Sequence, residues 1–384
     1  MFDSTNIFST TSDLVWEGWN RNASSWAGLF APFVIPVSPS GARSGTGSRP
    51  APKARTRAKQ SPMRVAQADS HTQFIDGAYT NDFGTREYKL FIPHGVPVSN
   101  LPLIVMLHGC QQTAEDFAAG THMNEIAQKN QCMVLYPSQA SGSNCQNCWN
   151  WFNKADQRRD SGEPSLIAGM TREIIESYRA DATRVYIAGM SAGGAMAASM
   201  AALYPDLFAA VGVHSGLPFG AANDIQTAIS AMSSGVRNLS DSDRPNEVQA
   251  VPLIVFHGDE DTTVHPGNAE QVIAWHLPEL HIDNDGRLPH ATAVERGSVE
   301  TGHAYTRTIH TTPLGLPIAE KWMVHGAGHA WSGGSKPGSF TDPRGPDAGA
   351  EMMRFFSQHS LDRVEADNIA TLRTLEAVDP QRAN

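Results

Sequence analysis

A serine flanked by glycines lies at residues 189–193, where the sequence reads Gly-Met-Ser-Ala-Gly. The β-branched residues before it predict a strand, and the Ala- and Met-rich residues after it predict a helix. On such a strand-to-helix turn the serine hydroxyl projects from the sheet, and the glycines leave room for the tight backbone. The same motif occurs in ordinary glycine-rich turns. Because partner residues follow in a suitable order, Ser191 is the candidate nucleophile for acyl transfer.

A carboxylate partner is expected after the apolar strand predicted at 251–256, where Asp259, Glu260 and Asp261 compete for the role. Enzymes with this serine turn place the acid after the serine and before the histidine in the chain. We favour Asp261, because Asp259 adjoins Gly258 at the strand exit, where it is better placed to cap the turn. The alternative is that all three are solvated loop residues.

The candidate base lies in the glycine-rich loop after the strand predicted at 319–324. We favour His329, because glycines at 326 and 328 allow a close approach to the serine, whereas His325 still adjoins the strand. The two histidines are four residues apart, and on a helix this spacing would allow both to bind one metal ion. The glycines between them argue against a helix. We expect neither a metal nor a cofactor.

Hydrolysis of an ester also needs amide donors for the oxyanion of the tetrahedral intermediate. In enzymes with this serine turn, one donor follows the nucleophile and another follows an early strand. The apolar strand predicted at 103–107 ends in His-Gly-Cys. We therefore assign the oxyanion hole to the backbone amides of Cys110 and Ala192.

Four motifs occur in order along the chain: Leu-His-Gly-Cys at 107–110, Cys-Trp-Asn-Trp-Phe at 148–152, Gly-Met-Ser-Ala-Gly-Gly at 189–194 and Gly-His-Ala-Trp-Ser-Gly-Gly at 328–334. Together they resemble the poly(3-hydroxybutyrate) depolymerase family of esterases. The resemblance extends over roughly residues 72–358 and implies an α/β-hydrolase fold. It also implies a serine esterase that uses Ser191, Asp261, His329 and the Cys110 amide.

The resemblance implies that the substrate is poly(3-hydroxybutyrate) or its oligomers, hydrolysed through an acyl-enzyme to mobilise stored polymer. Because the family also includes enzymes for other esters, one alternative is a cytoplasmic carboxylesterase for small soluble short-chain, feruloyl or acetyl esters. A second alternative is a non-catalytic granule-binding protein, which would not need an ordered Ser, Asp and His. We predict substrate contacts for Trp149, Asn150 and Trp331, because aromatic walls suit an apolar acyl chain. For Trp151 and Phe152 a core role is at least as well supported.

The regular pattern of residues 71–360 predicts one catalytic α/β domain, with a mostly parallel central sheet and helices on both faces. An antiparallel strand pair near residues 74–79 and 87–92 opens it, and further strands are expected near 103, 133, 184, 209, 252 and 319. Apolar residues at helical spacing predict a helix over 165–178. The stretches 220–250 and 277–300 are expected to form excursions over the site.

Two segments of different composition precede this domain. Residues 1–36 carry spaced aromatic residues, which could line one face of an interfacial helix, so we predict adhesion to polymer granules; packing onto the hydrolase is the alternative. Residues 37–70 are rich in Pro, Gly and Ser and hold seven Arg and Lys with no acid before Asp69. We expect a disordered linker there and no nucleic-acid partner. Residues 361–384 are expected to form a C-terminal tail.

The composition of the chain indicates the cellular compartment of the protein and the size of its core. A chain of 384 residues with 40% hydrophobic content and a net charge of −10 can bury one large core. Its first residues show no basic n-region or apolar h-region of a secretory signal, and no stretch is long enough to cross a membrane. Because few residues follow the last helix expected in the domain, we expect no C-terminal polymer-binding domain. These features predict a cytoplasmic protein, with a granule surface as its possible partner.

The four cysteines do not indicate a disulfide-dense secreted scaffold. Cys145 and Cys148 have Cys-x-x-Cys spacing, but no second such pair completes a zinc site. The family resemblance implies a bridge between Cys110 and Cys148, which a reducing cytoplasm would oppose, so the pairing stays open. Cys132 is predicted to be a buried strand residue.

Overall fold

The computed structural model describes residues 73–236, 251–276, 291–312 and 315–362. The chain divides into two units, 1–64 and 65–384, and all described residues belong to the second unit. The segments predicted at 1–36 and 37–70 therefore lie outside the described residues, as does the tail beyond residue 362.

The described part is built on a ten-stranded sheet with the order β1-β2-β4-β3-β5-β6-β7-β10-β9-β8. A separate two-stranded sheet joins β11 to β12. In chain order the strands are β1 (Gln73–Asn81), β2 (Gly84–Ile92), β3 (Leu103–Leu107), β4 (Met133–Pro137), β5 (Val185–Met190), β6 (Ala210–His214), β7 (Leu253–Gly258), β8 (Ala291–Ser298), β9 (Ala304–Thr311), β10 (Pro317–Val324), β11 (Trp331–Ser332) and β12 (Thr341–Asp342).

Six adjacent strands, from β4 to β10 in the sheet order, run parallel to one another. The predicted opening pair is antiparallel, since β1 pairs with β2 from Gln73↔Ile92 to Asn81↔Gly84. Strands β3 to β7 are buried along their whole length, as expected of parallel strands covered on both faces. The structure confirms the prediction of a mostly parallel α/β sheet.

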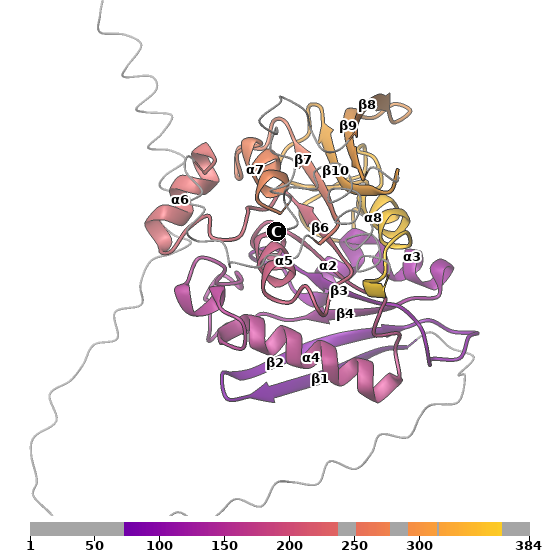
Figure 1. Ribbon diagram of the computed structural model, residues 1–384. Coiled ribbons are helices and arrows are strands. Elements are labelled where there is room, and N and C mark those ends of the chain that lie inside the picture. Colours follow the sequence, from indigo (N-terminus) through magenta and orange to yellow (C-terminus); the bar gives the residue numbers. More distant parts are fainter. Residues whose placement is uncertain (1–72, 237–250, 277–290, 313–314, 363–384) are drawn as a thin grey trace, which may run out of the picture. The chain divides into compact units, whose positions relative to one another are not determined.

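Helices cover both faces of the sheet (Figure 1). On one face α4, α5 and α7 pack against the strands, and α2, α3 and α8 pack on the other. The helices and the one 3-10 turn of the described residues are α2 (Ala114–Thr121), α3 (Met123–Asn130), η1 (Lys154–Gln157), α4 (Gly162–Tyr178), α5 (Ala192–Leu203), α6 (Ile225–Ser234), α7 (Gly267–His276) and α8 (Ala348–Phe356).

The core has two layers because successive side chains along each buried strand point to opposite faces of the sheet. On β5, Tyr186 stacks on Phe356 of α8, with ring centroids 5.0 Å apart. On β7, Phe256 stacks in the same way on Trp322 of β10, at 5.2 Å. Burial of such aromatic side chains is among the largest contributions that a single residue makes to stability.

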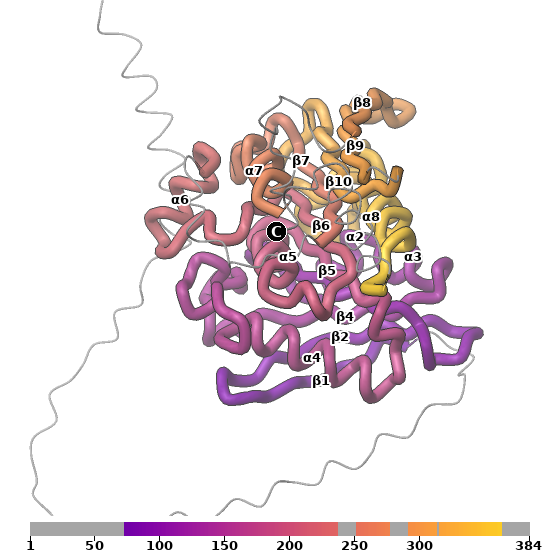
Figure 2. Tube along the Cα trace, viewed as in Figure 1, coloured from indigo at the N-terminus to yellow at the C-terminus, as the bar shows by residue number. Residues whose placement is uncertain are grey.

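The C-terminal part of the sheet departs from the sequence-based prediction. Residues 291–298, expected in an excursion, form edge strand β8, which pairs with β9 from Ala291↔Thr311 to Ser298↔Ala304. The prediction was wrong there because β8 is exposed along almost its whole length, so it lacks an apolar pattern. The trace in Figure 2 follows this hairpin at the end of the sheet. None of the described helices is long and apolar enough to span a lipid bilayer.

Candidate active site

Ser191 lies on a sharp turn between β5 and the first residue of α5. Its φ and ψ are 57° and −121°, a region that non-glycine residues rarely adopt. The turn needs its glycines, because a Cβ on Gly189 would overlap the carbonyl group of Gly193. The amide of Ser191 donates to the carbonyl of His214 at the end of β6, at 2.9 Å. The backbone is therefore held in the strained form that directs a serine side chain out of a sheet.

The sheet order brings the other predicted residues to the same edge. Strands β5, β6, β7 and β10 are neighbours and parallel, so the residues that follow their carboxyl ends meet there. Asp261 follows β7, and His329 follows β10. A Cβ on Gly258, at the end of β7, would overlap Ala327, so the two loops are in close contact.

Asp261 and His329 form a hydrogen bond, with 2.7 Å between Oδ2 and Nδ1. The other carboxylate oxygen, Oδ1, accepts from the amides of Thr263 and Val264. Burial opposes ionisation of Asp261, but hydrogen bonds from His257 and His329 outweigh it and hold the pKa of this carboxyl far below its usual range. Since Nδ1 donates to Asp261, the Nε2 of His329 keeps its lone pair and can accept a proton.

A second acid–histidine pair lies beside the first. Asp259, which the sequence pattern had suggested as a turn cap, accepts from the Nδ1 of His325 at 2.7 Å and from the amide of Gly326 at 2.7 Å. This pair is exposed: the His325 side chain is 43% accessible, whereas that of His329 is 12% accessible. This pair was not predicted, because contact between the two loops depends on the register of β7 and β10.

In the loop after β3, the amides on either side of Cys110 are paired. The amides of Gly109, Gln111 and Gln112 donate to the Gln112 side chain, the Gln146 carbonyl and the Gly109 carbonyl, respectively. Among the hydrogen bonds of the described residues, the amide of Cys110 has no acceptor. The amide of Ala192 has none either, as expected at the first position of a helix.

These two free amides belong to segments that touch. A Cβ built on Gly109 would lie 3.5 Å from the Cβ of Ser191, and one on Gly193 would overlap the carbonyls of Leu107 and His108. The loop after β3 therefore lies against the serine turn, which is the arrangement that an oxyanion hole requires.

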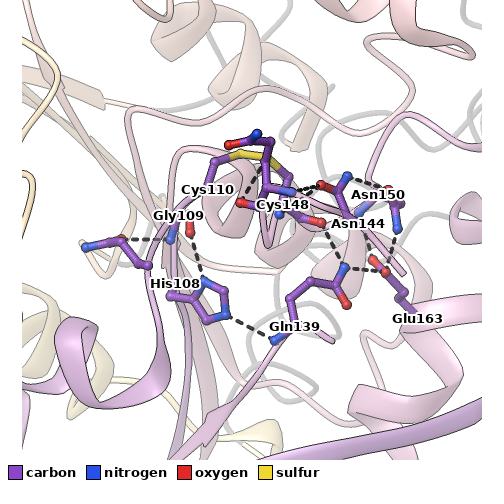
Figure 3. The surroundings of a disulfide bond; sticks show 10 residues. His108, Gly109, Cys110, Gln139, Asn144, Cys148, Asn150 and Glu163 are labelled. Carbon is purple, nitrogen blue, oxygen red and sulfur yellow. Dashed lines mark hydrogen bonds between the residues drawn. A yellow bond between two sulfur atoms is a disulfide. The ribbon is translucent and has the colours of Figure 1, made fainter. Parts of the chain in front are cut away.

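Buried polar side chains support this loop from below (Figure 3). The Nδ1 of His108 donates to the Gly109 carbonyl at 2.8 Å, and its Nε2 accepts from the Gln139 amide at 3.1 Å. Burial lowers the pKa of His108, which keeps the ring neutral. The Gln139 side chain in turn donates to Glu163 on α4. This support could not be predicted from the sequence, because the residues that provide it lie far apart in the chain.

The predicted substrate contacts need correction. Trp149 and Trp331 are 0% and 1% exposed, and both indoles lie in the core. The Trp331 ring stacks on His214 at 5.0 Å between centroids. Asn150 donates to Glu163 through both its backbone and its side-chain amide. Their positions favour structural roles, because the sequence could show that they belong to loops but not which way their side chains point.

His214 is a buried residue that the sequence analysis missed. Its Nε2 accepts from the Ser332 amide at 2.9 Å, three residues after His329. Burial, together with the nearby His257 and His329, lowers the pKa of His214 to about 3. The only available signal was a histidine at the end of an otherwise apolar strand, and this pattern does not indicate a role.

The neutral His214 predicts a loss of stability in acid. The unfolded chain takes up a proton as the pH falls below about 6.5, whereas the native ring stays neutral down to about pH 3. Between these two pH values, the contribution of His214 to the free energy of unfolding decreases by at most about 1.4 kcal/mol for each unit by which the pH falls. We expect the melting temperature of His214→Gln to depend less steeply on pH than that of the wild type, in scans from pH 7.5 to 4. Parallel curves would contradict this.

Cys110 and Cys148 form a disulfide, which answers the pairing question left open by the sequence. The bridge ties the predicted oxyanion loop to the loop before Trp149 (Figure 3). Cys132 is free and buried, as predicted, but it lies directly before β4 rather than within the strand, whereas Cys145 is free and exposed.

Loss of this bridge is expected to destabilise the protein. It joins residues 38 positions apart, for which loss of loop-closure entropy in the unfolded chain predicts about 4 kcal/mol. Urea unfolding of Cys148→Ala should show a free energy of unfolding lower by about that amount. Cys145→Ser, which removes a free thiol from the same loop, is the matched control and should unfold like the wild type. Equal stability of all three proteins would contradict the prediction.

Comparison with known proteins decides the family. Residues 86–293, more than half of the chain, match the esterase PHB depolymerase family model. The chain belongs to this family. The match includes the serine turn and Asp261 and ends before His329.

Individual relatives fit this assignment. Poly(3-hydroxyalkanoate) depolymerase C of Paucimonas lemoignei is 31% identical over 261 residues, which cover 65% of this chain and 60% of that protein. Feruloyl esterase B of Thermothelomyces thermophilus is 31% identical over 189 residues, 46% of this chain and 64% of that protein. This chain thus spans about three fifths of the length of these curated relatives.

The solved acetyl xylan esterase from Aspergillus awamori has a TM-score of 0.56 and 21% identity to this chain. The alignment covers 74% of this chain and 99% of that structure. At this identity the likeness concerns the fold, which is that of the α/β-hydrolase esterases.

Proposed function

We propose that this chain is a serine esterase that hydrolyses ester bonds of poly(3-hydroxybutyrate) or its oligomers. The observation that carries the proposal is the hydrogen bond between Asp261 and His329 at the sheet edge that also holds the strained turn of Ser191. Nucleophilic serine catalysis needs this arrangement: a base that is oriented by an acid and a serine that is presented on a rigid turn.

In this mechanism Ser191 attacks the ester carbonyl, and the Nε2 of His329 accepts the hydroxyl proton. Asp261 holds the imidazole in the required tautomer and stabilises its positive charge. The amides of Cys110 and Ala192 donate to the oxyanion of the tetrahedral intermediate. His329 then protonates the departing alcohol, and water that is activated by the same histidine releases the acid from Ser191.

The polymer substrate is supported by the relative named poly(3-hydroxyalkanoate) depolymerase C. Feruloyl esterase B and acetylxylan esterase A are also similar in sequence to this chain, so small soluble esters are the second candidate substrates. The amides and side chains described above act on the ester group itself, which both classes share.

The deciding experiment measures release of 3-hydroxybutyrate and short oligomers from amorphous poly(3-hydroxybutyrate) granules by the purified full chain. Release that disappears in Ser191→Ala supports the polymer substrate. Serine-dependent cleavage of soluble esters without release would favour a general carboxylesterase. Granule binding without hydrolysis of any ester would favour the non-catalytic alternative.

Granule association itself is a separate proposal, which rests on the aromatic segment 1–36. A variant that lacks residues 1–36 is expected to hydrolyse p-nitrophenyl butyrate at the wild-type rate but to remain in the supernatant when granules are sedimented. Equal loss of both properties would contradict an adhesion role. A wild-type level of sedimentation would do so as well.

A cytoplasmic location remains our proposal, and the disulfide provides its test. Reducing compartments keep such cysteine pairs as thiols, whereas oxidising ones preserve the bridge. Alkylation of freshly lysed cells followed by mass spectrometry should find Cys110 and Cys148 alkylated if the protein is cytoplasmic. Protection of both cysteines would place it in an oxidising compartment.

A further inference from the structure

His257 is a buried histidine that lies next to Asp261, on the end of β7. Its side chain is 0% exposed, and its strand position is fixed by pairing with Met323 of β10. The mechanism proposed above makes no use of it.

The hydrogen-bond partners of His257 determine its tautomer. The Nε2 atom lies 2.8 Å from the carbonyl oxygen of Val264 and 3.4 Å from Oδ2 of Asp261. Both oxygens accept hydrogen bonds, so Nε2 must carry the hydrogen. Within the described part of the chain, the Nδ1 atom has no partner. A neutral ring leaves only an acceptor unpaired there, whereas an imidazolium would bury an unpaired donor together with its charge.

Two histidines thus approach one carboxylate oxygen. Oδ2 of Asp261 lies 2.7 Å from the Nδ1 of His329 and 3.4 Å from the Nε2 of His257. Oδ1 is already occupied by the amides of Thr263 and Val264. Without His257, Oδ2 would keep one donor among the described residues, His329, and His329 has to move a proton during the reaction.

We propose that His257 is a positioning residue for catalysis: its Nε2–H, bonded to the Val264 carbonyl, also faces Oδ2 of Asp261 and holds that oxygen in place while His329 accepts and returns the serine proton. The proposal rests on the serine esterase function proposed above. The same N–H also binds the Val264 carbonyl and so fixes the turn from Asp261 to Val264. Its titratable neighbours include Asp261 and His214, and both interact with it electrostatically.

The test compares two amides that replace different nitrogens of the ring. In His257→Gln the amide nitrogen can reach the place of Nε2, whereas in His257→Asn it corresponds to Nδ1. We expect kcat for p-nitrophenyl butyrate to fall about tenfold in His257→Asn and in His257→Leu, since a hydrogen bond to a charged group is lost. KM should stay close to the wild-type value, and His257→Gln should recover most of the loss.

A pH profile separates positioning from simple loss of packing. With one donor fewer, Asp261 holds the imidazolium of His329 more strongly, so the acid limb of kcat/KM should move to higher pH in His257→Leu. His276→Leu, which removes an equally buried histidine from α7, should leave the limb in place. An acid limb that does not move upward, or equal kcat in the Gln and Asn variants, would overturn the proposal.

Two further measurements keep the outcomes distinct. Ser191→Ala is assayed in parallel, and activity of this variant would contradict the proposed esterase mechanism. An inactive Ser191→Ala together with a fully active His257→Leu would contradict only the role proposed for His257. Ring ¹⁵N NMR of the unsubstituted protein needs no variant to fold. It should show a ring proton of His257 on Nε2, and a ring with its proton on Nδ1 instead would overturn the proposal.

Discussion

Ser191→Ala is expected to lower kcat for a soluble ester by about ten thousandfold to a millionfold, since Ser191 forms the acyl-enzyme in the proposed mechanism. The substitution should leave the fold intact, because the Ser191 turn is held by backbone contacts with His214 and Gly193. The residual rate reports what the oxyanion amides contribute without a nucleophile. Initial rates with p-nitrophenyl butyrate measure the effect.

The matched control for this variant is Ser199→Ala. Ser199 lies on α5, the helix that follows the Ser191 turn, is also buried, and donates to the Ala195 carbonyl at 2.9 Å. Its replacement should change kcat by less than about twofold, because a substitution away from the site acts at most on stability. Comparable losses in both variants would mean that the serine turn is not the site of reaction.

Asp261→Asn has the second largest expected effect, a loss of about ten thousandfold in kcat. An amide side chain can offer its NH₂ group to His329 and so favour the tautomer with the hydrogen on Nε2, which cannot accept the serine proton. It also leaves the developing imidazolium without its negative partner. The pH–rate profile at saturating ester measures both consequences.

The neighbouring pair supplies an internal control for this assignment. Asp259 bonds to His325 over the same 2.7 Å that joins Asp261 to His329. We expect Asp259→Asn to lower kcat only a few-fold, through the loop contact it makes with the amide of Gly326. If Asp259→Asn were the more damaging of the two, the catalytic pair would be Asp259 and His325.

Much of the fold could be read from the sequence because its signals are local. Apolar runs of five or six residues predicted the buried strands β3, β4, β5, β6 and β7, and helical spacing predicted α4. Edge strand β8 was missed, since an exposed strand has no apolar pattern to recognise. The same reasoning explains why Ser191 was a strong candidate: its glycines are required by steric constraints within one turn.

The sequence by itself determined which residue types follow which strands, and hence a serine, an acid and a histidine in the order of a hydrolase. The choice of pairs was decided only by the tertiary structure, through the parallel register of β7 and β10, which faces Asp261 with His329 and Asp259 with His325. The inward orientation of Trp149 and Trp331 and the approach of His257 to Asp261 likewise depend on packing. Such contacts join residues far apart in the chain or across a loop, and side-chain direction there follows from the whole core rather than from neighbouring residues.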